Sequence, residues 1–142
     1  MTQEQILEQL FDNNFVEDTF NLTKNERIKI KLKSLTPDDY LEADKILTTF
    51  KGSKMFILQK FALEKLSRGL TTYYGKEVIK FESPNEAKEF LEKLPVTLVD
   101  SMIKIQEKFE KEITQAISLE AVEENFFETP GLQEKQEQLL KA

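Results

Sequence analysis

One stretch near the start of the chain alternates apolar and basic residues, and this alternation most constrains the fold. In RIKIKLK, residues 27–33, the apolar side chains of Ile28, Ile30 and Leu32 fall between cations. A period of two places the apolar side chains on one face of a β-strand and the cations on the other. A lone strand leaves backbone N–H and C=O groups unpaired, and a helix cannot pair with them. The chain must therefore contain further strands.

A second β-type segment, TTYYGKEVIKF, spans residues 71–81. Residues that favour strands lie on both sides of Gly75, where a positive φ would suit a tight turn. This pattern predicts a β-hairpin that pairs with strand 27–33 in a small antiparallel sheet. Most of the remaining chain has helical periodicity. The predicted fold class is therefore α+β, a mostly helical single domain with a small antiparallel sheet.

Helix-start signals are spread over the rest of the chain. Each is a Ser or Thr that can accept a hydrogen bond from the first helical turn, and two of them are followed by Pro. Apolar residues at helical spacing predict buried faces on these helices, and the helix that starts after Ser53 is the candidate for the central core helix. The predicted helices cover 3–12, 37–50, 54–69, 84–94, 96–117 and a short last segment capped by Ser118. The residues expected to be buried on 37–50 are Leu41, Ile46, Leu47 and Phe50, and those on 54–69 include Met55, Phe56, Leu58, Phe61, Leu63 and Leu66.

The length of 142 residues indicates one domain. We expect that domain to cover residues 26–131, after an N-terminal helical or irregular arm at 1–25 and before a polar C-terminal tail at 132–142. The arm either folds back on the core or docks on a partner. A helical start without a basic leader, and the lack of a long apolar run, lead us to expect a cytoplasmic protein.

The chain contains no Cys and no His, and only four Gly. These absences argue against disulfides, Cys/His metal sites, Ser-His triads and glycine-rich phosphate loops. Ser101 and Lys104 form one i, i+3 Ser–Lys pair, a spacing that solvated helix surfaces also carry. The acidic cluster at 38–44 is explained by helix capping. We therefore expect no enzyme activity, no cofactor and no metal.

Charge is unevenly distributed along the chain. Residues 1–25 carry −4, residues 26–80 carry +5 and residues 81–142 carry −7, which sum to the net charge of −6. The acidic flank of one subunit can meet the basic centre of another, or the charges can simply form a solvated surface. A net negative charge argues against general nucleic-acid binding.

The long helix predicted at 96–117 has apolar positions that continue into a strongly charged half. We expect this distal stripe, with the apolar residues that follow it, to exceed what the core can cover and to bind a partner. The alternative is that the C-terminal tail folds back over the stripe. The candidate contact residues are Phe109, Ile113, Ile117, Val122, Phe126 and Phe127.

Four segments in order resemble phage tail assembly chaperones and the short baseplate-assembly proteins similar to them. These segments are IKIKLKSLTPDDYLEA, TTYYGKEVIKF, EAKEFLEKLPVTLVDSMIKIQEKF and VEENFFETPG. The resemblance covers about residues 26–131 and rests on pattern and order. It implies a non-enzymatic protein that binds a helical client, the tape-measure protein, before the tail tube polymerises. It carries over no individual binding residue.

Two other functions remain as alternatives. One is a structural subunit of a phage tail, virion or tail-like particle, which mass spectrometry of purified particles would detect. The other is an acidic inhibitor of a host enzyme, which requires acidic side chains clustered on one face.

Overall fold

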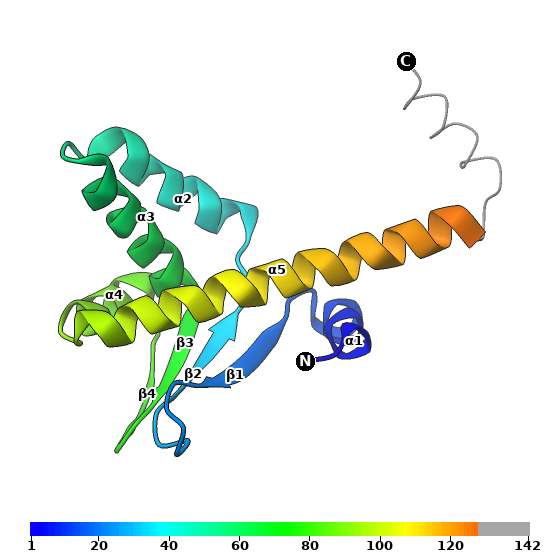
Figure 1. The fold of residues 1–142 in the computed structure, drawn as a ribbon, viewed down its shortest axis with the longest axis horizontal. Coiled ribbons are helices and arrows are strands. Elements are labelled where there is room, and N and C mark those ends of the chain that lie inside the picture. Colours follow the sequence, from blue (N-terminus) through cyan, green and yellow to red (C-terminus); the bar gives the residue numbers. More distant parts are fainter. Residues whose placement is uncertain (128–142) are drawn as a thin grey trace.

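The structure, a computed structural model, describes residues 1–127, with side chains described for residues 1–119. Within that part of the chain, five helices and a four-stranded sheet form an α+β fold (Figure 1), which confirms the predicted class. The predicted tail at 132–142 lies outside the described residues. In chain order the elements are α1 (Gln3–Asn13), β1 (Glu17–Asn21), β2 (Lys29–Lys33), α2 (Pro37–Thr49), α3 (Lys54–Gly69), β3 (Leu70–Tyr74), β4 (Val78–Lys80), α4 (Pro84–Glu92) and α5 (Val96–Phe127).

The sheet is antiparallel throughout, with strand order β1-β2-β3-β4. The alternating segment forms β2, and β3 with β4 forms the predicted hairpin, so both predictions are confirmed. In β2, Ile30 pairs with Phe20 on one side and Tyr73 on the other. Ile30 and Leu32 are fully buried, while the lysines between them stay partly exposed. The alternation therefore separates a core face from a charged face.

The turn between β3 and β4 differs from the prediction, because Gly75 does not adopt a positive φ. Its small size matters instead: a Cβ there would lie 2.9 Å from the ring of Tyr73. Among the described glycines, the positive φ belongs to Gly52, in the loop between α2 and α3. Glycine thus serves close approach in one turn and backbone conformation in the other.

The N-terminal segment folds back on the core, which decides between the two alternatives for residues 1–25. The expected helix forms as α1, with the Thr2 and Gln5 capping box present. The irregular or partly helical conformation expected after it is wrong, because β1 pairs along its length with β2. Ile6 and Val16 are buried in the main hydrophobic cluster. This segment is an integral part of the domain.

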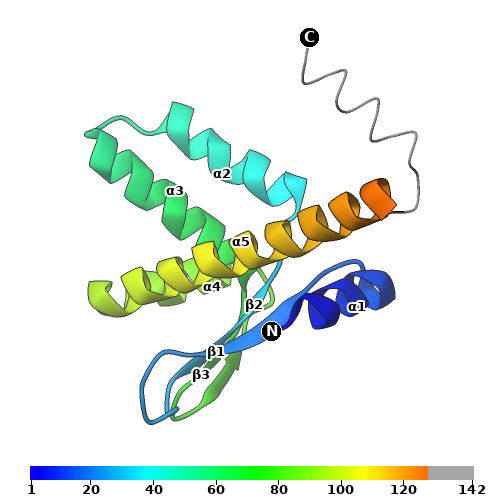
Figure 2. The same ribbon diagram turned by 45° about the vertical axis from the view of Figure 1, so that its right-hand side comes forward.

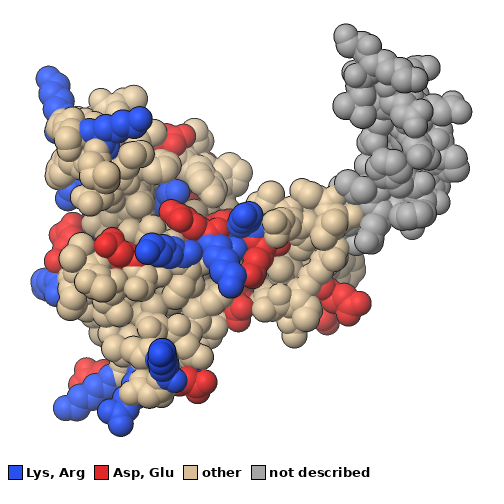
Figure 3. Space-filling model, viewed as in Figure 1, with Lys and Arg blue, Asp and Glu red and all other residues tan. Residues whose placement is uncertain are grey.

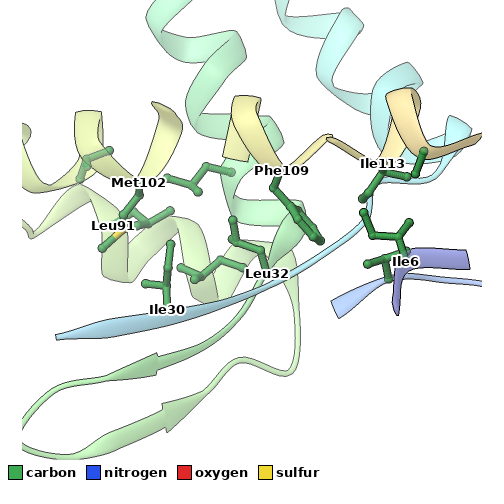
Figure 4. Close-up of a cluster of buried hydrophobic side chains, with 12 residues drawn as sticks. Ile6, Ile30, Leu32, Leu91, Met102, Phe109 and Ile113 are labelled. Atoms are coloured by element: carbon green, nitrogen blue, oxygen red, sulfur yellow. The ribbon is translucent and has the colours of Figure 1, made fainter. Parts of the chain in front are cut away.

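The core lies between the sheet and the two helices α4 and α5 (Figure 4). Leu91 from α4 and Met102 from α5 pack there with Ile30 and Leu32 of the sheet. Farther along α5, Ile113 lies beside Ile6 of α1 (Figure 4). The sheet, α4 and α1 therefore all pack against α5. Helix α5 has the central position in the core that was expected for α3.

Helix α5 is continuous over 32 residues, so the expected break at Ser118 is wrong. No Pro or Gly occurs between Pro95 and Pro130, and a lone serine is tolerated within a helix. The N-caps expected at Thr36, Ser53 and Ser83 are confirmed, because each hydroxyl accepts a backbone N–H from the first turn of its helix.

Helices α2 and α3 form a hairpin that projects away from the sheet (Figures 1 and 2). The C-terminal half of α3 enters the core through Leu66, whereas its N-terminal half, with Met55, Phe56 and Leu58, is exposed. The prediction that α3 is the central core helix is therefore wrong. Of the four residues expected to be buried at 37–50, only Ile46 is buried. The other three, Leu41, Leu47 and Phe50, are exposed.

Candidate protein-binding surface

Two of the predicted contact residues on α5 belong to the core. Phe109 is 2% exposed and its ring packs edge-on against Phe20 at 5.3 Å between centroids. Ile113 is 7% exposed and lies beside Ile6 (Figure 4). The prediction that these two side chains form an exposed contact surface is wrong, because β1 and α1 cover them.

The remaining predicted contact residues lie farther along the same helix. Ile117 is 47% exposed, and it therefore stays a candidate for partner contact. The backbone of α5 continues as helix through Phe127, but the side chains of Val122, Phe126 and Phe127 lie outside the described side chains. Their role in binding stays a prediction.

The main exposed apolar surface of the described residues lies instead at the end of the α2–α3 hairpin. We define the hairpin end as residues 47–60, the last turn of α2, the loop and the first half of α3. Met55 is 66% exposed, and four further large apolar side chains there are also exposed. These are Leu47, Phe50, Phe56 and Leu58. Single exposed apolar residues are ordinary, whereas a cluster of five on one protruding element is typical of an interaction site.

A shallow groove continues this surface from α3 onto the start of α5. The groove has a volume of about 200 Å³, and its walls are mostly apolar. Phe56 and Leu63 line it from α3, while Val96, Val99 and Ile103 line it from α5. Val96 is 69% exposed. A row of apolar side chains on two neighbouring helices is the kind of surface that receives one face of an amphipathic helix.

The hairpin end is also basic. It carries three lysines, Lys51, Lys54 and Lys60, and no acidic residue, for a formal charge of +3. Lys60 Nζ lies 5.6 Å from the ring centre of Phe56, so that the cation borders the groove. Figure 3 shows lysine or arginine side chains projecting from this corner of the molecule. A partner with acidic residues beside its apolar stripe would match this surface in both respects.

A charged network at the base of the hairpin connects α2, α3 and α4. Arg68 Nε lies 3.2 Å from Glu64 Oε1, and its Nη1 lies 3.6 Å from Asp39 Oδ1. Arg68 Nη2 reaches Glu42 Oε2 at 4.0 Å, and Lys88 of α4 pairs with the other oxygen of Glu64. Glu64 is buried, so its negative charge is stabilised by both cations, Arg68 and Lys88, in place of water. This network fixes the direction in which the hairpin leaves the body.

A second anchor joins the start of α2 to α5. The Glu110 carboxylate accepts a hydrogen bond of 2.9 Å from the backbone N–H of Leu35. Burial raises the pKa of Glu110 above its ordinary value, and this hydrogen bond and Lys65 offset part of that rise. Burial also raises the pKa of the neighbouring Tyr40 phenol, with a smaller contribution from the Glu110 charge. The hairpin is therefore held by polar contacts at its base while its end stays apolar.

The hairpin end was missed from the sequence because its apolar residues follow helical spacing, which usually marks a core face. One signal was available: residues 47–60 combine apolar residues with lysines and lack any acid. A buried helix face has no need of cations at that density.

No group of three or more acidic side chains in residues 1–119 is arranged to hold a metal ion. No helix among the described residues is long and apolar enough to cross a lipid bilayer. Comparisons of the chain with protein-family models, with curated proteins and with solved structures found no match. Function is therefore inferred from the exposed surface and from the resemblance of the sequence.

Proposed function

We propose that this chain is a non-enzymatic assembly chaperone that binds a helical client, such as a tape-measure protein, during phage tail assembly in the host cytoplasm. The observation that carries the proposal is the exposed apolar and basic hairpin end, with the groove that continues from it. The sequence resemblance to tail assembly chaperones supplies the class of client. A long helical client exposes apolar stripes before the tail tube surrounds it, and such stripes aggregate unless they are covered.

The mechanism follows from the physical character of the surface. The apolar side chains of the hairpin end and the groove cover part of a client stripe, removing it from water. Lysines around the surface select client segments that carry acidic residues next to the stripe. Because the surface is small and open, the contact releases readily when tube subunits compete for the client. A covering that is too tight would block assembly.

The test is co-purification with the tape-measure protein encoded in the same genome. Met55→Asp with Leu58→Asp places two charges on the hairpin end, and we expect a loss of client binding on the order of tenfold or more. Both residues are exposed, so the melting temperature of the chaperone itself should stay close to that of the wild type. The matched control is Val78→Asp, which changes an exposed apolar residue on β4 of the sheet, away from the α2–α3 hairpin.

The proposal fails if the double variant binds the client as well as the wild type does. It also fails if the wild-type chain binds no tape-measure protein when the two are co-expressed. Loss of binding in the Val78 control alone would place the contact on the sheet and would overturn the assignment of the surface.

A further inference from the structure

The distal end of α5, residues 117–127, is acidic, whereas the hairpin end is basic. It carries three acidic residues, Glu120, Glu123 and Glu124, and no basic residue, for a formal charge of −3. Apolar residues recur through the same segment, and Ile117 and Leu119 are exposed. Figure 1 shows α5 continuing past α1. This segment is an acidic helix with apolar positions, the kind of partner that the hairpin end fits.

We infer that the distal end of α5 of one copy docks on the hairpin end of a second copy. The charges are opposite and equal, −3 against +3, and both segments combine these charges with exposed apolar residues. Opposite charges steer the two surfaces together and fix their register, while the apolar residues supply most of the contact energy. The interaction goes beyond the client proposal but uses the same surface, so it rests on the hairpin end being the contact site.

The geometry excludes docking within one chain. The groove beside the hairpin end includes Val96, at the first residue of α5. Helix α5 runs over 32 residues, roughly 48 Å at about 1.5 Å per residue, so its distal end lies far from the groove of its own chain. A continuous helix cannot fold back over itself. A second copy is the occupant that brings the two segments together.

Two copies can make both contacts at once. When their α5 helices lie antiparallel, the distal end of each helix meets the first turns of the other, next to the partner's hairpin end. Such an arrangement is isologous, so it closes as a dimer and does not continue as a filament. The hairpin end would be covered in the dimer and freed when a client displaces the partner. Self-association would then protect the apolar surface until a client is present.

The experiment is a charge swap on the full-length chain, measured by analytical ultracentrifugation over a range of protein concentrations. One variant carries Lys51→Glu and Lys54→Glu, and the other carries Glu123→Lys and Glu124→Lys. Each reversal turns attraction into repulsion, and we expect each variant alone to dimerise on the order of tenfold or more weakly than the wild type. An equal mixture of the two should associate again, because every contact between unlike chains then joins opposite charges.

A control variant with Lys76→Glu and Lys80→Glu changes two exposed lysines near the β3–β4 turn and should dimerise as the wild type does. Wild-type dimerisation should weaken as salt is raised. The inference is overturned if the wild type stays monomeric at all concentrations, if neither reversal weakens association, or if the mixture fails to restore it. Client binding is measured separately. If the chain stays monomeric but binds the tape-measure protein, the dimer inference fails and the proposed function stands. If the charge-swap experiment supports the dimer but the chain binds no tape-measure protein, the proposed function fails and the dimer inference stands.

Discussion

Ile113 and Ile117 lie one helical turn apart on α5 and differ sharply in burial, so they form a matched pair. Ile113 is 7% exposed, whereas Ile117 is 47% exposed. Truncating a buried Ile to Ala removes three carbons from apolar surroundings, which costs about 2.4 kcal/mol at about 0.8 kcal/mol per carbon, and the cavity adds to this. We expect Ile113→Ala to lower the free energy of unfolding by about 3 kcal/mol. For Ile117→Ala we expect about 1 kcal/mol, because half of that side chain already contacts water.

Urea denaturation followed by far-UV circular dichroism measures both losses under the same conditions. The slope of the unfolding free energy against urea should be unchanged, since neither truncation alters the surface exposed on unfolding by much. If Ile113→Ala does not fold, Ile113→Val gives a smaller loss of about 0.5–1.5 kcal/mol that is measurable on its own. Equal losses at the two positions would refute the reasoning, because they would mean that α1 does not cover Ile113 in solution.

Two further predictions concern the anchors of the hairpin. Lys88→Met removes one of the two cations beside the buried Glu64, and we expect it to lower the free energy of unfolding by about 1–3 kcal/mol. The loss should be smaller than for a fully buried pair because Arg68 remains beside Glu64. Lys93→Met at the exposed C-cap of α4 should change the free energy of unfolding little, and equal losses for the two variants would contradict a stabilising role of the network. Glu110→Gln removes a carboxyl group whose pKa is raised by burial in the folded state. The wild type should therefore gain stability relative to the variant as the pH falls from 7 towards 4.5, as chemical denaturation at several pH values would show, and a constant difference would contradict it.

The elements that the sequence predicted are those whose signals are local. Alternation in RIKIKLK defined β2, because a half-buried strand needs one apolar face whatever its neighbours are. The hydroxyl of Thr36 and the proline after it marked the start of α2, since both act within a single turn. Gly75 located the hairpin turn correctly even though its role there is close approach to Tyr73.

Strand β1 was not predicted because its stability comes from a distant partner. Its sequence, EDTFN, has weak strand propensity, and Phe20 is the one large apolar side chain in it. Val16, Phe20 and Leu22 do share the parity of one strand face, but Asp18 interrupts their pattern. Strand β1 is stabilised by its backbone hydrogen bonds to β2, which the local sequence of β1 does not predict.

The burial of Phe109 and Ile113 was mispredicted for the same reason. Apolar residues at helical spacing occur on both α3 and α5, and periodicity alone does not say which stripe meets the core. The sheet and α1 pack against α5, so Phe109 and Ile113 are buried, while the first half of α3 extends beyond the body. Which stripe is covered is a consequence of tertiary topology. The absence of acids near Met55 was the one local clue.

On the face of the molecule that Figure 3 shows, the acidic residues do not form the patch that mimicry of nucleic acid requires. A mimic needs acids gathered on one face, whereas Figure 3 shows acidic and basic side chains interspersed over the visible face. At the base of the hairpin, Asp39, Glu42 and Glu64 are engaged in pairs with Arg68 and neighbouring lysines. These pairs neutralise acids at the base of the α2–α3 hairpin, and the hairpin end itself carries three lysines and no acidic residue. An acidic, apolar helix fits the charge of the hairpin end, whereas a basic groove of a host enzyme would not bind at that surface.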